Sequence, residues 1–203
     1  MKKKLLYISL FMLLICGGRV LAQEQENTFF KEHHLVIKTN LASAALGNIN
    51  LAGEIGLNSG NTAHPLTLHV PVSYNPFIYG GNGKLKHFAV QPELRLWQGG
   101  AFSKFFVGLH AHYAYYNVGG ISGINKKLKE NRYQGNLFGM GLSGGYTYMI
   151  NYKFGFETAL GLGYAFMNHD IYDCQHCGSK TGEENKIYFG PTKLAISLVY
   201  KIR

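Results

Sequence analysis

Large apolar side chains alternate with small or polar side chains in eight segments of the chain. Because successive side chains of a strand point to opposite faces of a sheet, this pattern predicts β-strands. We expect an all-β protein with the architecture of an eight-stranded antiparallel up-and-down transmembrane β-barrel. The predicted strands span residues 35–42, 49–57, 66–73, 88–96, 105–115, 138–148, 154–164 and 194–200.

The lengths of the connections between these segments support this architecture. In a barrel with both ends in the periplasm, the second, fourth and sixth connections are short turns, and the odd-numbered ones are outer loops. The sequence gives short connections at residues 98–104 and 151–153 and an intermediate one at 58–65. Long connections are expected at residues 75–86, 117–136 and 168–186. The first connection, around Gly47, is the exception, because it is short.

Charged residues of both signs fall on the polar face of the predicted strands. An eight-stranded barrel is narrow enough for side chains to fill it, and a lone buried charge is unfavourable by several kcal/mol. We therefore expect a plugged lumen in which these charges pair with one another and neighbouring polar side chains complete their hydrogen bonds. The charges are Lys38, Glu54, Glu93, Arg95, Glu157 and Lys193, and the expected polar neighbours are Asn40, His69, Gln91, His110 and His112.

The first 22 residues have the form of a cleavable export signal. Lys2, Lys3 and Lys4 precede an apolar run from Leu5 to Ile15, and small residues follow up to Ala22. We expect cleavage after Ala22, leaving residues 23–203 as one domain in the outer membrane. The apolar run is shorter than the roughly 17–25 residues that a helix needs to span a bilayer, and no later run is longer.

The composition indicates contact with lipid and gives no reason to expect nucleic acid. Loss of the signal removes four basic residues and lowers the formal charge from +9 to +5. The remaining basic residues concentrate between Lys126 and Arg132, which is typical of a solvated loop. Only 15% of the residues are charged and 14% are aromatic, which suits a surface that faces outer-membrane lipid. Tyrosines near strand ends, such as Tyr113 and Tyr148, are expected in the aromatic girdles of the barrel.

Cys174 and Cys177 form the one local motif with the spacing of a reactive or ligating site. In an oxidising compartment two cysteines this close most often form a disulfide, which is our preferred interpretation. The pair could also bind Zn²⁺ with His169 or His176, or remain as free thiols. Because a second Cys-x-x-Cys motif is missing from the sequence, we assign no metal and no cofactor.

The sequence carries no strong signature of an enzyme. It has no phosphate-binding glycine loop, no Gly-x-Ser-x-Gly elbow and no His-Glu-x-x-His motif, so we expect a non-enzymatic protein. Two alternatives remain open. The first is a soluble secreted barrel of the lipocalin type, which would enclose a small apolar ligand. The second is a lipid-modifying outer-membrane enzyme that uses His110 and His112, although both alternate toward the lumen.

Four segments resemble a known family of small outer-membrane β-barrels. They are Val72–Phe77, Val90–Trp97, Tyr116–Gly120 and Phe189–Lys193, and the resemblance extends from about Lys38 to Tyr200. The family occurs in Gram-negative anaerobes, often near genes for fimbrial assembly, and carries only a label of unknown function. The resemblance implies an outer-membrane barrel that acts through its outer loops as a surface or envelope protein. Fimbrial or other envelope proteins are the partners that it implies, with a role accessory to fimbria assembly or adhesion.

Overall fold

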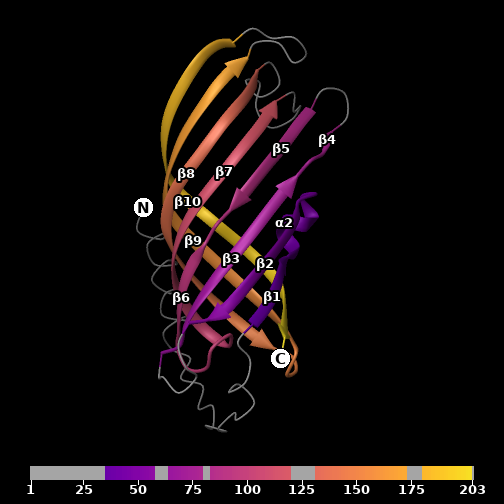
Figure 1. The fold of residues 1–203 in the computed structure, drawn as a ribbon, viewed down its shortest axis with the longest axis vertical. Helices are drawn as coiled ribbons and strands as arrows, with labels where there is room; N and C mark the ends of the chain where they lie inside the picture. The colour runs from indigo at the N-terminus through magenta and orange to yellow at the C-terminus, as the bar shows by residue number, and fades with distance from the viewer. Residues whose placement is uncertain (1–34, 58–63, 80–82, 120–130, 173–179, 203) are drawn as a thin grey trace, which may run out of the picture.

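The computed structural model describes residues 35–57, 64–79, 83–119, 131–172 and 180–202, and these form an antiparallel all-β fold with one short helix (Figure 1). The expected all-β antiparallel class is thereby confirmed. The predicted export signal, Cys174, Cys177 and the lysines between 126 and 129 lie outside the described residues. The elements are β1 (Leu35–Asn40), α2 (Leu41–Ala45), β2 (Ile49–Gly56), β3 (Leu66–Asn75), β4 (Ile78–Tyr79), β5 (Gly83–Val90), β6 (Glu93–Trp97), β7 (Lys104–Gly119), β8 (Arg132–Met149), β9 (Phe154–Tyr172) and β10 (Lys180–Ile202).

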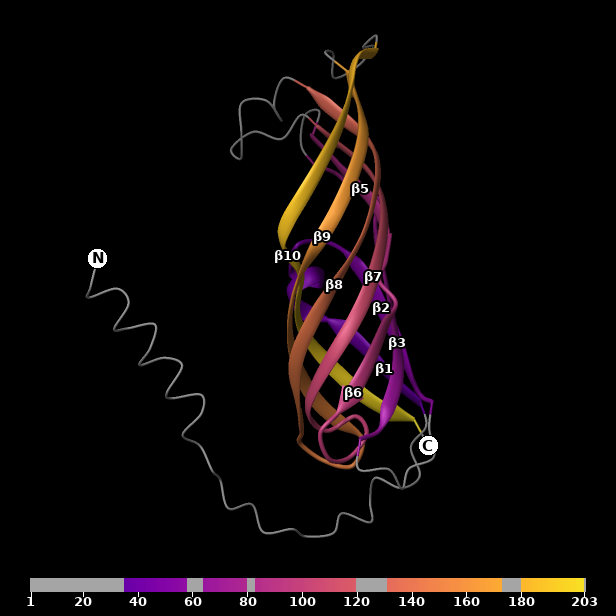
Figure 2. The ribbon, with the colours of Figure 1, turned by 90° about the vertical axis from the view of Figure 1, so that its left-hand side faces the viewer.

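The strands form one sheet that closes on itself in a ring. Strand β1 pairs with β2 on one side and with β10 on the other, which joins the first strand to the last. From β10 the sheet continues through β9, β8 and β7, and β3 links the far end back to β2. Strands β5 and β6 follow one another along the chain and share the place between β3 and β7. The strands slope across the long axis in Figure 1 and curve around it in Figure 2.

A proline explains why the predicted strand at 88–96 is interrupted. The structure ends β5 at Val90 and begins β6 at Glu93, with Gln91 and Pro92 between them. Pro92 has no backbone N–H and so cannot donate a hydrogen bond to the ladder at this point. Its carbonyl oxygen accepts a bond from the Ala111 backbone N–H at 3.0 Å, so β7 remains attached across the break.

The predicted boundary of the first strand was wrong at its C-terminal end. The alternation predicts a strand as far as Ala42, but β1 ends at Asn40 and α2 begins at Leu41. The Asn40 side-chain oxygen accepts hydrogen bonds from the backbone N–H groups of Ala42 and Ser43 at 3.1 and 3.3 Å. This is the bonding pattern of a helix N-cap, for which asparagine is among the preferred residues.

The long connections were predicted to be longer than they are. Strand β7 runs to Gly119 and β8 begins at Arg132, although residues 117–136 were expected to form a loop. In the same way β9 and β10 extend into the predicted loop at 168–186, up to Tyr172 and from Lys180. Most residues on both faces of these extensions are polar, with Val118 and Ile171 as exceptions, so no apolar alternation marks them in the sequence. Hydrogen bonding to neighbouring strands nevertheless continues there.

The two faces of the ring have opposite character. Large apolar side chains lie on the outer face and are exposed, as for Leu142 (68%) and Leu160 (65%). Charged and hydroxyl side chains lie on the inner face, where Arg95 and Glu54 are both fully buried. No helix among the described residues is long and apolar enough to cross a membrane.

Candidate functional site

Arg95 lies at the centre of the ring interior and contacts three carboxylates from three other positions in the chain. Its guanidinium lies 2.8 Å from Glu54, 3.1 Å from Glu93 and 3.1 Å from Glu157. Glu93 shares β6 with Arg95, Glu54 comes from β2 on the other side of β3, and Glu157 comes from the more distant β9. A guanidinium presents several N–H donors in a planar fork, which suits it to bridging carboxylates that approach from different directions.

Two lysines complete this cluster. Lys38 of β1 lies 2.5 Å from Glu54 and also donates to Glu157. Lys193 of β10 donates to Glu93. All six side chains that were assigned to the lumen from sequence are therefore buried and joined, and we call them the charge network. It contains three positive and three negative groups, so that no member of the network has to bear an uncompensated charge.

Hydroxyl groups, and not the predicted histidines and amides, supply the further hydrogen bonds of the carboxylates. Thr67 donates to Glu54, Ser143 donates to Glu93, and Thr147 donates to Glu157 at 2.9 Å. The expected polar neighbours bond elsewhere. Gln91 donates to the Thr192 carbonyl oxygen, Asn40 caps α2, and His69 approaches Glu54 only to 3.6 Å. Short hydroxyl side chains reach the carboxylates without displacing the cations that surround them.

Aromatic side chains form a floor beneath the charge network, which sequence reasoning missed. Arg95 lies over the Phe106 ring at 4.2 Å from its centroid, and Lys38 lies 5.6 Å from the Trp97 ring. Phe102, in the turn between β6 and β7, is 2% exposed and packs against Val36 and the Trp97 ring. The sequence does indicate that Trp97 lies inside, because residues 93, 95 and 97 point to the same face of a strand.

Glycines line the wall that faces the network on β7, β8 and β9. A Cβ atom at Gly108 would lie 2.3 Å from a Glu93 carboxylate oxygen, and one at Gly161 would lie 2.9 Å from the Lys193 Cβ atom. The small residues on the inner face of these strands therefore leave the space that the charged side chains occupy. The alternation of these glycines with large apolar residues predicts strands but does not tell which charged residue each glycine faces. The structure supplies these pairs.

The two histidines of the enzymatic alternative lie inside the ring. His110 and His112 are buried, with ring centroids 5.7 Å apart. The His110 Nε2 atom lies 3.0 Å from the Thr192 hydroxyl, a pairing that was not expected from the sequence. The His110 Nδ1 atom has no hydrogen-bond partner among the described residues.

Above the network the interior contains a cavity of about 210 Å³. Its lining includes Asn50, His69, Gln91 and Thr192, and its lower boundary is formed by Lys38 and Glu157. Beneath it, the charge network and the aromatic floor occupy the ring. The described side chains thus fill the lower part of the interior and leave a small polar space above.

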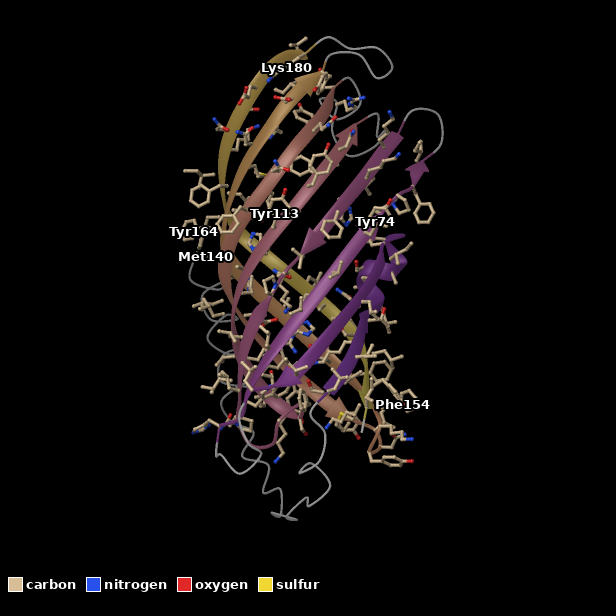
Figure 3. The ribbon with its side chains drawn as sticks, in the orientation of Figure 1. Tyr74, Tyr113, Met140, Phe154, Tyr164 and Lys180 are labelled. Carbon is tan, nitrogen blue, oxygen red and sulfur yellow. The ribbon has the colours of Figure 1, made fainter. Side chains whose placement is uncertain are left out.

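Strands β7 to β10 continue upward beyond the ring closure, and we call this extension the projecting sheet. It comprises residues 115–119, 132–136, 168–172 and 180–185 and carries Lys180 at its upper end (Figure 3). Lys180 pairs with Asp170 at 2.6 Å and with Glu183 at 3.1 Å, and these hydrogen bonds raise the pKa of Lys180. The paired groups are 34–53% exposed, in contrast to the charge network.

Within the part of the chain that the structure describes, the edge of β10 is open along most of its length. Pairing with β1 covers only Ser197 to Ile202, so among the described residues no strand pairs with residues 180–196 on the side opposite β9. The Asn40 side chain occupies the first free positions, where it donates to the Leu194 carbonyl oxygen and accepts from the Ile196 N–H. Above this point the edge resembles a strand that lacks a neighbour, a feature that favours pairing with another chain.

No group of three or more His, Cys, Asp or Glu side chains is placed to hold a metal ion within the part of the chain that the structure describes. The predicted disulfide between Cys174 and Cys177 lies outside that part and stays a prediction. His169, its suggested metal-binding neighbour, lies 3.1 Å from the Tyr116 hydroxyl and 3.6 Å from Glu184. His169 therefore contacts Tyr116 and Glu184 within the projecting sheet.

Comparison with known proteins identifies one family. A family model described as "Protein of unknown function (DUF3575)" matches residues 9–202, which is nearly the whole chain. No curated protein matches the chain, and no solved structure matches it either.

Proposed function

The chain belongs to this family of proteins of unknown function, and we propose that it is a non-enzymatic, eight-stranded β-barrel of the outer membrane. In this proposal the lumen is plugged, and the protein acts through the projecting sheet as a docking point for another envelope protein. The signal for export in residues 1–22 gives the route to that membrane. Counting β5 and β6 as one interrupted strand gives the eight strand positions of such a barrel.

The distribution of side chains between the two faces is the observation that carries the proposal. Exposed Leu, Phe, Tyr and Val side chains cover the outer face, and the charged side chains are buried inside. A soluble barrel that encloses an apolar ligand requires the opposite distribution. Lipid is the environment in which an apolar exterior is stable and a polar interior remains favourable.

The dimensions of the apolar surface suit a bilayer. On β9 large apolar side chains occupy the outer face from Phe154 to Phe166, apart from Thr158, which is about 40 Å of strand at a rise of ~3.3 Å per residue. A tilt of ~40° reduces this to roughly 30 Å along the axis, close to the thickness of the hydrocarbon core of a bilayer. Tyr74, Tyr113 and Tyr164 lie at a similar height in Figure 3, with Phe154 near the lower end, as aromatic girdles would.

The filled interior argues against a diffusion pore. Arg95, Glu54 and Glu157 meet across the ring, and Phe102 closes the space beneath them. A planar-bilayer recording should therefore show no stable ion conductance from the purified protein. Sustained channels at neutral pH would contradict the plugged lumen while leaving the membrane location intact.

The first experiment tests the membrane location directly. The protein is extracted from the cell envelope and run on a denaturing gel with and without boiling, because closed membrane barrels resist detergent until they are heated. We expect extraction to require detergent and the unboiled protein to migrate faster. A protein that stays in the aqueous fraction and shows no heat shift would overturn the proposal and make a search for an apolar ligand the next step.

The open edge of β10 supports the docking role, because an unpaired strand can add an extended segment of a partner. The family resemblance points to fimbrial or other envelope proteins as that partner. Residues 169–184 can be replaced by Asn-Gly, since Asn168 and Asn185 face each other in register. We expect this trimmed protein to keep its heat shift and to lose its contribution to the number of assembled surface fimbriae.

A matched control trims the neighbouring hairpin instead. Asn117 and Gln134 also face each other in register, so residues 118–133 can be replaced by Asn-Gly without touching the β10 edge. This control should support normal fimbriation. If trimming of residues 169–184 leaves fimbriation unchanged, or if both trimmed proteins lose it equally, the part of the β10 edge in the projecting sheet, residues 180–184, is not the docking element.

A further inference from the structure

A row of three asparagines crosses the outer face of the sheet immediately above its apolar surface. Asn136 of β8 is paired in register with Asn168 of β9, and Asn168 is paired with Asn185 of β10. All three are exposed. The row therefore places three side-chain amides side by side on adjacent strands, where neighbouring residues lie roughly 5 Å apart.

The row directly beneath is apolar. Phe138, Phe166 and Ile187 precede or follow the asparagines by two residues and so lie on the same face. They are paired with one another in the same order, and their side chains are 54%, 55% and 72% exposed. The exposed apolar row and the exposed amide row are thus only two residues apart along each strand.

The two rows border a hollow in the outer surface. Its volume is about 540 Å³, and its lining includes all three asparagines together with Phe138, Phe166 and Ile187. At its β7 side, the Tyr113 hydroxyl donates to the Asn136 side-chain oxygen at 3.2 Å. Below the hollow, Tyr164 and Phe189 pack with ring centroids 4.7 Å apart. The hollow is large enough for a headgroup of one or two sugar rings and is continuous with the apolar surface below.

We propose that this hollow binds the sugar headgroup of a glycolipid in the outer leaflet, with the acyl chains lying over the apolar row. Each side-chain amide carries both donors and an acceptor, which matches the hydroxyl groups of a sugar. Aromatic rings next to the amides offer flat apolar faces for the C–H face of the sugar. Phe138, Phe166 and the Tyr164–Phe189 pair are placed to contact either a ring or the first carbons of a chain.

This inference rests on the proposed membrane location, since a lipid ligand requires that the outer face meets the bilayer. A soluble sugar would use the same amides, but it would gain nothing from the apolar row and its continuation below. The register of the two rows therefore favours a ligand that is polar at one end and apolar at the other.

The test measures lipid retention by native mass spectrometry of the full-length protein in detergent micelles. Lipid A, a phosphorylated glucosamine disaccharide with acyl chains, is the probe, and phosphatidylglycerol is the comparison lipid. The triple variant Asn136→Leu, Asn168→Leu, Asn185→Leu removes the amides, and the triple Asn→Gln variant keeps them. Tyr148→Leu, at the opposite rim of β8, controls for a change in the apolar surface.

We expect the wild-type protein to retain lipid A in preference to phosphatidylglycerol. The triple Leu variant should lose this preference by roughly ten-fold, while the triple Gln and Tyr148→Leu variants keep most of it. Equal retention of the two lipids by the wild type, or unchanged retention by the triple Leu variant, would overturn the glycolipid site. Displacement of lipid A by the free glucosamine disaccharide at similar concentrations would likewise overturn it, in favour of a soluble sugar.

The heat shift on a gel distinguishes failure of the glycolipid site from failure of the membrane proposal. If wild type and variants all show the heat shift and lipid A is not preferred, the barrel proposal survives and the glycolipid site fails. If the wild type itself shows no heat shift and needs no detergent, the membrane proposal fails and the glycolipid site fails with it.

Discussion

The ring interior and the projecting sheet use charged residues in opposite ways. In the interior, Arg95 and Glu54 are both fully buried and form part of a cluster that joins several strands. In the projecting sheet, Lys180 and Asp170 are 46% and 34% exposed and belong to adjacent strands of one sheet edge. The same types of side chain therefore form a buried connection between distant strands in one region and solvated surface pairs in the other.

The burial of the ion pairs, and not their number, decides how much the fold depends on them. An exposed pair contributes ~0–1 kcal/mol, because water and salt compensate its loss. Removing one partner of a buried pair leaves a charge that water cannot reach. Substitutions in the two regions should therefore differ in their effect on stability by several-fold.

The largest effect is expected from Arg95→Met in the ring interior. The substitution leaves three buried carboxylates with only Lys38 and Lys193 as partners within the network, and should lower the free energy of unfolding by roughly 3–5 kcal/mol. Urea unfolding in detergent micelles measures the change. Adding Glu157→Gln should recover part of the loss. A loss below ~1 kcal/mol for Arg95→Met would show that the network is dispensable.

A charge on the outer face should be the next most damaging change. Leu142→Arg places a guanidinium at a position on β8 that is 68% exposed, and in the proposed lipid environment it should destabilise the protein by roughly 2–4 kcal/mol. Gln134→Arg is the matched control, because it lies on the same face of the same strand but in the projecting sheet. Equal, small effects of the two substitutions on folding into liposomes would contradict a lipid-facing surface.

A methyl group in the glycine wall should have an intermediate effect. A Cβ atom at Gly145 would lie 2.5 Å from the Phe106 ring and 2.5 Å from the Thr158 carbonyl oxygen, so Gly145→Ala forces the wall or the aromatic floor to shift. We expect a loss of roughly 1–3 kcal/mol in the same urea assay. Gly53→Ala provides the comparison, since a Cβ atom there meets nothing within 4 Å, and it should be nearly neutral.

The smallest effect is expected in the projecting sheet. Lys180→Met removes two exposed ion pairs and should leave the free energy of unfolding nearly unchanged, with any difference vanishing at high salt. Comparison with Arg95→Met in the same urea series sharpens the contrast between the regions. A loss of similar size for both would mean that the ion pairs of the projecting sheet are as important to the fold as the charge network.

Much of the charge network could be assigned from sequence, because the face of a strand residue follows from its parity. Lys38, Glu54 and Arg95 each fall on the polar face of a clear alternation, and the structure buries all three. The aromatic floor escaped notice because Phe102 lies in a turn, at a φ of 60°, where alternation has no meaning. The alternation correctly assigns the histidines to the inner face. It does not tell how far along the barrel axis they lie from the carboxylates, so their predicted hydrogen bonds to the carboxylates were wrong.

The strand class, the polar and apolar faces and the six charges of the network follow from the sequence alone. These are local properties, fixed by the two-residue period of a strand. The partners of these charges depend on the folded chain, because Lys38 and Glu157 are 119 residues apart and Lys193 and Glu93 are 100 residues apart. The lengths of β7 to β10 also depend on the folded sheet. Hydrogen bonds between neighbouring strands continue these strands through segments in which most side chains are polar. Ring closure brings those distant residues into contact, and no local pattern of side chains encodes it.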